Sequence, residues 1–414
     1  MTGSIGVGVN VNEGITEELR RELIKGLDFS RDLTDEEVRD AIRGRIISAS
    51  RDRYIPIRDM NRLTAEIFDS VRRLGPLQRY IDDESISEIM VNGPSEIFLE
   101  RNGHIERAET CLMSEEQLEN IIQIIVSSVN RSVNEANPIV DARLSDGSRV
   151  NVVLPPIALN GAIVTIRKFP KQPMSMERLL NYGTIDEKAA SFIEKIVAAG
   201  CNIIVSGGTS SGKTSFLNAL SEFIPKRERV IVMEDSAELQ LTGIPNLVRL
   251  ETRNANIEGK GEIGIADLIK SSLRMRPDRI VVGEVRDGLA AVNLLNAFNT
   301  GHIGESTIHS NSASDTISRL ETLLLTGSSI PLAAAERQIA SAVDYIIYLG
   351  RLSDGRRKCL EICELEGVYD ESIKLRKIFS YDDGTDSLAV VEKPAKSLVK
   401  LMRAGEDIDG LFDI

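Results

Sequence analysis

The sequence predicts an α/β protein whose C-terminal part is built on a parallel β-sheet with crossover helices. Segments of helical length separate three short apolar runs, which are residues 202–206, 229–233 and 279–283. Between the last two runs, apolar residues recur at helical spacing from Ile265 to Leu273, and Pro277 follows them. A third observation is the glycine-rich stretch at 207–214, which lies directly after the first run.

A helical N-terminal extension is predicted over residues 1–75. Thr34 and Glu37 have the spacing of a capping box, in which each side chain accepts from the backbone of the other residue. Apolar residues at helical spacing follow, namely Val38, Ile42 and Ile46. Gly75 and Pro76 then interrupt the pattern.

Residues 76–172 are predicted to form a mixed α/β domain, because β-type runs such as residues 96–99 alternate with turn sequences. The segment 169–173 contains two prolines and no apolar periodicity, so we expect a linker there. Residues 173–414 then form the domain that contains the parallel sheet. A chain of 414 residues is long enough for two or three such units.

Composition favours a soluble globular protein, with 42% hydrophobic and 27% charged residues. We find neither a signal peptide nor an apolar run of membrane-spanning length, so we expect a cytoplasmic protein. The four cysteines are scattered and suit a reducing compartment. Cys359 and Cys363 lack a second pair for a zinc site, and alternation along a strand explains them better.

The formal net charge is −13, which makes nucleic acid an unlikely partner. A local cluster of arginines opposes this balance: Arg43, Arg45, Arg51, Arg53, Arg58 and Arg62. A solvated helix face interleaved with acids is the simpler interpretation of that cluster.

The stretch GGTSSGKT matches the P-loop pattern and lies between an apolar strand and a predicted helix. Its eight residues are the predicted nucleotide-binding set: Gly207, Gly208, Thr209, Ser210, Ser211, Gly212, Lys213 and Thr214. The glycines let consecutive backbone N–H groups face phosphate oxygens beside a helix N-terminus. Lys213 would neutralise the β and γ phosphates of ATP, and the Thr214 hydroxyl would bind Mg²⁺.

Three later segments offer groups for hydrolysis. Glu234 and Asp235 follow one predicted strand, and Glu284 follows another, where a carboxylate can polarise a water molecule. The segment 301–311 contains His302 and His309, two of the three histidines of the chain. A neutral imidazole can donate to a phosphate oxygen, although a lone histidine is more often structural and a lone acid more often solvated.

Three arginines of the upstream domain, Arg143, Arg149 and Arg167, offer further phosphate contacts. Surface salt bridges are the alternative for each of them.

Together these residues resemble the secretion ATPase superfamily that drives type II secretion, type IV pili and type IV secretion, most closely its tight-adherence (Tad) pilus branch. Besides the P-loop, four strings carry the resemblance, which covers about residues 75–380: EIMVNG at 88–93, DARLSDGSRV at 141–150, LRMRPD at 273–278 and RLET at 319–322.

The resemblance implies a RecA-like ATPase domain and a homo-hexameric ring whose nucleotide lies between the two domains. It implies that Glu284 is the catalytic glutamate of an atypical Walker B motif in which Gly283 replaces the usual Asp. Glu234 and Asp235 correspond to the acidic box that helps to hold Mg²⁺, and His309 to the histidine box.

Arg149 and Arg167 correspond to arginines that approach the phosphates. The implied partners are polytopic platform proteins of the inner membrane, on whose cytoplasmic face the ring would be peripherally associated.

The sequence departs from the tight-adherence pattern at two places. Six residues separate His302 from His309, where that branch has seven, and Asp287-Gly-Leu289 replaces two glycines and an acid. The tetracysteine module of type II secretion motors is absent, which favours the tight-adherence branch. The sequence leaves open a type IV conjugative ATPase, a ring that binds ATP without hydrolysing it, a GTPase and a DNA-processing motor.

Overall fold

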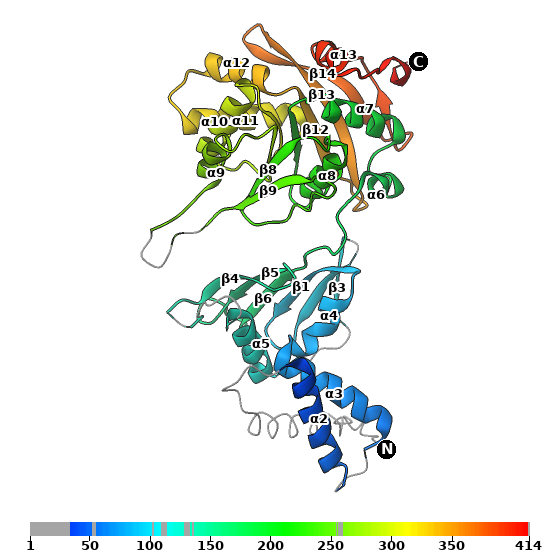
Figure 1. Cartoon of the computed structure of the whole chain (residues 1–414), viewed down its shortest axis with the longest axis vertical. Coiled ribbons are helices and arrows are strands. Elements are labelled where there is room, and N and C mark those ends of the chain that lie inside the picture. The colour runs from blue at the N-terminus through cyan, green and yellow to red at the C-terminus, as the bar shows by residue number, and fades with distance from the viewer. Residues whose placement is uncertain are drawn as a thin grey trace, which may run out of the picture. The chain divides into compact units, whose positions relative to one another are not determined.

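The computed structural model describes residues 34–51, 55–101, 103–108, 114–127, 133–134, 136–253, 255 and 260–412 (Figure 1). Most of the first half of the predicted N-terminal extension, together with Arg53 and Cys111, lies outside these residues. The chain divides into two compact units, residues 1–171 and 172–414. Within the described residues, every helix is too short or too polar to cross a bilayer.

Unit 1 begins with a helical pair, α2 (Asp35–Ala49) and α3 (Ile57–Arg72). The predicted capping box is confirmed, because the Thr34 side chain accepts from the Glu37 backbone and the Glu37 carboxylate accepts from the Thr34 backbone. The two helices share a small apolar core that includes Ile42, Ile67 and Phe68. The described part of the predicted helical extension therefore contains two helices that pack against each other.

The rest of unit 1 is a mixed α/β layer. A six-stranded antiparallel sheet has the order β3-β2-β1-β6-β5-β4. Its apolar face packs against α5, whose buried residues include Ile121, Ile122 and Ile125. The elements are η1 (Gly75–Leu77), α4 (Gln78–Asp82), β1 (Ile86–Asn92), β2 (Ile97–Arg101), β3 (His104–Arg107), α5 (Glu115–Ser127), β4 (Ile139–Arg143), β5 (Arg149–Val153) and β6 (Ile163–Arg167).

Unit 2 is built on a nine-stranded sheet with the order β15-β14-β13-β12-β7-β11-β10-β8-β9. Strands β12, β7, β11, β10, β8 and β9 pair in parallel, which confirms the predicted parallel sheet. Its strands are β7 (Ile203–Gly207), β8 (Arg229–Glu234), β9 (Asn246–Glu251), β10 (Arg279–Val282), β11 (Ile303–His309), β12 (Tyr345–Arg351), β13 (Arg357–Tyr369), β14 (Ser372–Asp382) and β15 (Ser387–Val390).

Helices cover both faces of this sheet, because alternate residues of its buried strands enter two different cores. Ile203 and Val205 belong to one core and Ile204 to the other. The helices of the first face are α6 (Met176–Asn181), α7 (Glu187–Ala198), α8 (Lys213–Leu220) with η2 (Ser221–Phe223), and α13 (Leu398–Ala404) with η3 (Asp409–Leu411). Those of the second face are α9 (Ile265–Ser272), α10 (Gly288–Asn299), α11 (Ala313–Gly327) and α12 (Leu332–Ala342).

Helices α10 and α11 touch through their backbones at one point. A Cβ on Gly288 would lie 2.5 Å from the Gly327 backbone nitrogen, and a Cβ on Gly327 would lie 2.3 Å from the Gly288 carbonyl carbon. Only glycine at both positions permits this approach.

A buried ion cluster holds the amino ends of the central strands. The Arg279 guanidinium is fully buried and lies 2.5 Å from Glu305 Oε1 and 2.7 Å from Glu228 Oε2. It also donates to the Val197 carbonyl at the end of α7. The cluster thus connects β10, β11, the loop before β8 and one covering helix.

We predict that Arg279→Ala lowers the free energy of unfolding by about 3–5 kcal/mol, because it leaves two buried carboxylates without their cation. Urea denaturation followed by circular dichroism measures this difference. Arg274→Ala is the control, since Arg274 is exposed. Equal stability of the two variants would contradict the role given to the cluster.

Candidate functional site

The P-loop connects β7 to α8 with a backbone that requires glycine. Gly207 and Gly212 have φ angles of 155° and 96°, which side chains rarely adopt. A Cβ on Gly207 would also lie 2.4 Å from the Leu349 carbonyl oxygen of β12. The predicted strand–loop–helix context of this motif is therefore present.

The parallel register brings the carboxyl ends of four strands to the same edge as this loop. His309 pairs with Gly207, while Val282 pairs with Ser306 on one side and with Met233 on the other. Residues that follow these strand ends therefore meet beside the loop. This edge is where ligands of parallel α/β sheets bind.

A continuous line of polar contacts runs along the edge. Lys213 Nζ lies 3.2 Å from His309 Nδ1, and His309 Nε2 lies 3.0 Å from Glu284 Oε1. Lys213 also donates to the carbonyls of Gly207 and Gly208, at 3.0 and 2.8 Å. The structure thus brings together three residues that the sequence predicts for the site.

The contacts assign the protons of His309. An ammonium group can only donate, so Nδ1 accepts from Lys213 and the ring proton of the neutral form lies on Nε2, facing Glu284. Burial, together with the Lys213 charge, lowers the pKa of His309 below its ordinary value of about 6.5. His309 is therefore neutral at pH 7. Its Nε2 is at ion-pair distance from Glu284 Oε1 but is not aligned for a hydrogen bond.

Arg286 extends the line and is a residue that the sequence did not single out. Its guanidinium donates to Glu284 Oε2 at 2.7 Å and lies 3.6 Å from an Asp235 carboxylate oxygen. Glu284 is largely buried, with 14% of its side chain exposed, whereas the Arg286 side chain is 64% exposed. The only feature of the sequence that could have indicated Arg286 is its position two residues after Glu284, the carboxylate at the end of a predicted strand.

The two neighbouring acids of the predicted acidic box have different surroundings. Glu234 is buried and accepts from the backbone N–H groups of Glu238 and Leu239, both at 2.8 Å. Burial raises the pKa of Glu234, and the two backbone donors oppose that shift. Asp235 is exposed and lies near Arg286. Glu234 therefore fixes the loop after β8, while Asp235 lies on the line of contacts.

Local structure explains why a glycine stands at position 283 and an aspartate at position 287. A Cβ on Gly283 would lie 3.1 Å from Glu234 Cγ, so the missing side chain leaves room for that carboxylate. Asp287 is the N-cap of α10 and accepts from the Ala290 backbone. The turn that departs from the family pattern thus starts a helix.

Arg149 and Arg167 lie directly opposite each other on neighbouring strands of unit 1. Arg143 lies opposite Arg149, and Glu88 lies opposite Arg167, so the four residues form one row across β4, β5, β6 and β1. Residues in one row project from the same face of a sheet. Arg143 thereby extends the predicted arginine pair.

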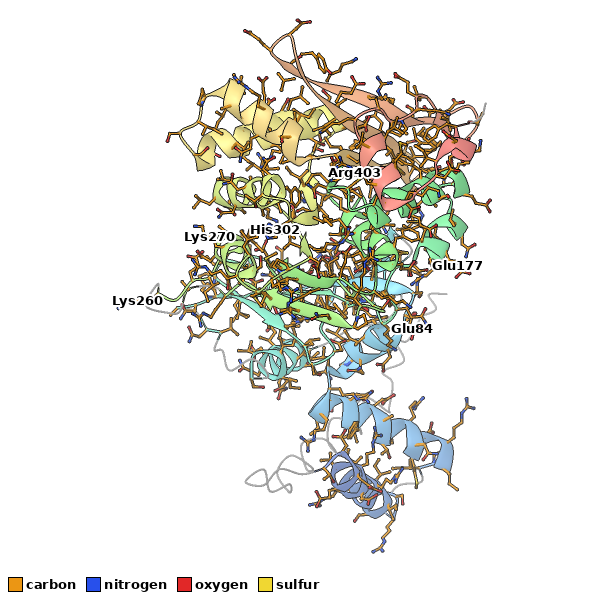
Figure 2. All side chains as sticks on the ribbon, turned by 45° about the horizontal axis from the view of Figure 1, so that its top comes forward. Glu84, Glu177, Lys260, Lys270, His302 and Arg403 are labelled. Atoms are coloured by element: carbon orange, nitrogen blue, oxygen red, sulfur yellow. The ribbon has the colours of Figure 1, made fainter. Side chains whose placement is uncertain are left out.

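The remaining sequence candidates lie elsewhere. His302, labelled in Figure 2, precedes β11 and lies about 23 Å of strand away from His309. Its ring nitrogen Nδ1 contacts the Thr300 hydroxyl and the Ala297 carbonyl. Cys201, Cys359 and Cys363 are buried and free. Across the described residues, no three histidine, cysteine, aspartate or glutamate side chains could hold a metal ion together.

The loop residues fit the phosphates of a nucleotide. A Cβ on Gly208 would meet no atom within 4 Å, so the space beside the backbone is open. Ser211 Oγ is buried without a hydrogen-bond partner among the described residues. Thr214 lies in the first turn of α8, where a hydroxyl can reach a cation bound by phosphate. The fold and the site together define a P-loop nucleotide-binding protein.

Comparison with known proteins gives the family. The model of the type II/IV secretion system protein family matches residues 71–386, and this chain belongs to that family. The conjugal transfer protein TrbB of Rhizobium radiobacter is 36% identical over 292 residues, covering 69% of this chain and 86% of TrbB. The type IV secretion system protein VirB11 of Bartonella henselae is 30% identical over 345 residues, covering 74% of this chain and 94% of VirB11.

Among solved structures, the pilus retraction motor PilT with bound ADP resembles this chain with a TM-score of 0.52. The two sequences are 19% identical, and the match covers 80% of this chain and 86% of PilT. This likeness supports the RecA-like fold predicted for the C-terminal part.

We predict that His309→Asn makes the free energy of unfolding less dependent on pH. Below about pH 6.5 the unfolded chain binds a proton at His309 that the folded chain does not, because the folded pKa is lowered. This contribution to stability is present above pH 6.5 and is lost as the pH falls towards the folded pKa.

Urea midpoints at about pH 7.5, 6.5 and 5.5 measure this effect. The midpoint should fall less steeply in His309→Asn than in the unchanged chain. The control variant Asn311→Ala, which removes a neighbouring exposed group that does not titrate, should keep the original slope. Identical slopes in all three proteins would contradict the prediction.

Proposed function

We propose that this chain is an ATPase that uses Mg²⁺ and, as a homo-hexamer, powers pilus assembly or protein secretion at the cytoplasmic face of a membrane. The observation that carries the proposal is the line from Lys213 through His309 to Glu284, which connects the phosphate-binding loop to a largely buried carboxylate. Family membership supports it. The protein would work with polytopic inner-membrane platform proteins and would not require nucleic acid.

Each residue of the site has a separate task in this proposal. The backbone N–H groups of residues 207–214 bind phosphate oxygens, and Lys213 exchanges its contacts with loop carbonyls for the β and γ phosphates. Glu284 orients and polarises the attacking water. Bound Mg²⁺, held by the Thr214 hydroxyl and by waters on the acidic box, would neutralise phosphate charge.

His309 would report the state of the phosphates. When Lys213 turns towards a phosphate, Nδ1 loses its donor, and the neutral ring can donate through Nε2 to Glu284 or to a phosphate oxygen. Arg286 would hold Glu284 through its second oxygen during this change. The imidazole ring thus couples the position of the Lys213 ammonium group to the position of the Glu284 carboxylate.

Two branches of the family compete for the biological role. The strings at 88–93, 141–150, 273–278 and 319–322 favour the tight-adherence pilus branch. The relatives TrbB and VirB11 favour a type IV conjugative ATPase. Deletion of the gene distinguishes them, since loss of surface pili under electron microscopy supports the first role and loss of plasmid transfer supports the second.

We expect Glu284→Gln to bind ATP with ordinary affinity but to hydrolyse it at least about tenfold more slowly, because an amide cannot accept a proton from water. Phosphate release and binding of a fluorescent ATP analogue measure the two properties. Glu262→Gln, at an exposed position, is the matched control. Near-normal ATP turnover by Glu284→Gln would contradict the catalytic role given to Glu284. If the unchanged chain shows no ATP turnover, the protein is instead a ring that only binds ATP.

Arg149→Ala and Arg167→Ala should each lower kcat/KM for ATP by about tenfold or more, because each would remove a cation from the phosphates. Steady-state phosphate release measures the loss. Arg107→Ala is the control, since Arg107 lies in the same sheet on β3 and pairs with Glu96. Equal kinetics in all three variants would assign Arg149 and Arg167 to surface salt bridges.

A further inference from the structure

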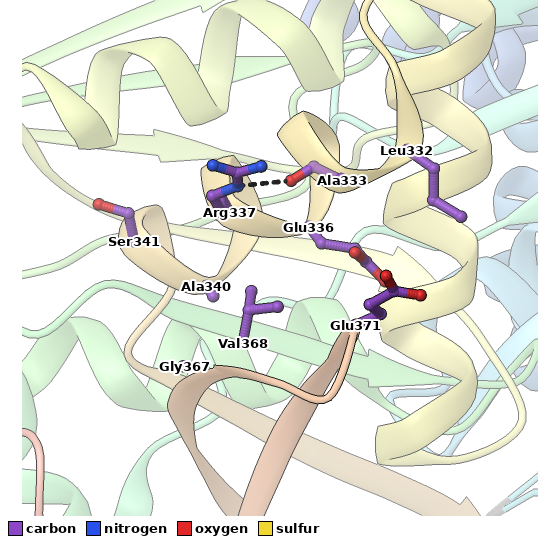
Figure 3. A pocket seen from close by; sticks show the side chains of 9 residues that line it. All are labelled: Leu332, Ala333, Glu336, Arg337, Ala340, Ser341, Gly367, Val368 and Glu371. Carbon is purple, nitrogen blue, oxygen red and sulfur yellow. Dashed lines mark hydrogen bonds between the residues drawn. The ribbon is translucent and has the colours of Figure 1, made fainter.

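A groove on unit 2 lies between helix α12 and the turn that connects β13 to β14 (Figure 3). Its volume is about 830 Å³. Leu332, Ala340 and Val368 contribute apolar walls, and Glu336 and Glu371 contribute carboxylates. None of these residues belongs to the nucleotide site.

Glu336 is buried in an unusual way. Only 6% of the residue is exposed, yet its carboxylate makes no hydrogen bond or ion pair with any residue that the structure describes. Neither oxygen of this carboxylate is among the fully enclosed atoms that lack a hydrogen-bond partner, so the charged end of the side chain reaches the surface of the groove. Burial and the charge of Glu336 also raise the pKa of Glu321 on the neighbouring helix α11. The groove is therefore short of positive charge.

The side chains of Glu336 and Glu371 point towards one another in Figure 3. Arg337, which also lines the groove, donates instead to the Ala333 carbonyl of its own helix, at 3.0 Å, and its side chain points away from the two carboxylates. The two carboxylates therefore receive no cation from Arg337, and a basic group of another molecule could pair with both of them.

A basic side chain fits this groove better than a metal ion. No cluster of metal-ligating side chains lies there or elsewhere in the described part of the chain. An arginine can lay its aliphatic stem along Leu332 and Val368 while its guanidinium pairs with two carboxylates. The space also accommodates the residues that flank such an arginine.

We propose that the groove docks an arginine-bearing cytoplasmic loop of the polytopic membrane protein with which this ATPase works. This inference rests on the proposed function, which places the protein beside such a partner. Loops of membrane proteins on the cytoplasmic side are enriched in lysine and arginine. Their charge complements both the groove and the net charge of −13 of this chain.

The test uses fluorescein-labelled 20-residue peptides that cover the cytoplasmic loops of a polytopic platform protein from the same organism as this chain. Fluorescence anisotropy measures their binding to the full chain. At least one arginine-bearing peptide should bind, and Glu336→Gln should weaken that binding at least tenfold. Replacing the peptide arginine with neutral citrulline should weaken it equally, and the two changes together should cause no further loss.

Control variants distinguish the loss of a contact in the groove from a general change in net charge and from misfolding. Glu371→Gln lies on an exposed turn and should weaken binding even if Glu336→Gln disturbs folding, whereas Glu187→Gln, at an exposed position on α7, should not. ATP turnover should be unchanged in all three variants. If the unchanged chain does not hydrolyse ATP, the proposed ATPase activity is refuted. Peptide binding would still test the groove, because it is measured separately.

Three outcomes would overturn the inference. The first is that no loop peptide binds, and the second is that binding is the same in both groove variants as in the unchanged chain. The third is that spermidine, but no peptide, binds in a manner that depends on Glu336, which would make the groove a polyamine site.

Discussion

The parallel pairing of β7, β11, β10 and β8 is the constraint on which the site depends. Each strand is fixed against its neighbours by a ladder of backbone hydrogen bonds and by alternate residues that enter two different cores. A shift of one residue would exchange the two faces of a strand and is therefore excluded by packing. Gly207 and His309 are consequently held side by side, with Glu284 on the next strand end.

The same strands have opposite chemistry at their two ends. At the amino ends, Arg279 is enclosed with Glu305 and Glu228, and these charges are satisfied within the protein apart from one oxygen of Glu305. At the carboxyl ends, the line from Lys213 to Asp235 is partly exposed. The charges at one end of the sheet are thus enclosed in the protein, and those at the other end are partly open to solvent.

Local patterns in the sequence predicted what depends on local structure. The capping box at Thr34 depends on residues three apart, and the P-loop depends on glycines within eight residues. The apolar runs predicted the central strands because those strands are buried on both faces. The end of one apolar run also placed Glu284 near the loop, whereas His309 was assigned through the family resemblance.

Features that depend on tertiary contacts were not predictable in this way. Strands β13 and β14 contain many charged residues, such as Lys374 and Arg376, because part of their surface faces solvent and forms cross-strand ion pairs with Glu366. Their composition therefore does not resemble that of a buried strand.

Arg286 became part of the site only because two strand ends bring Glu284 and Asp235 within its reach. The separate surroundings of Glu234 and Asp235 likewise depend on how the loop after β8 folds back.

The contact between Gly288 and Gly327 has a mechanical consequence. Helix α10 begins four residues after Glu284, and helix α11 begins four residues after His309. Because the start of α10 is pressed against the end of α11, the two helices cannot slide past each other at that point. A change in the separation of Glu284 and His309 would therefore act on two helices whose backbones are in direct contact at Gly288 and Gly327.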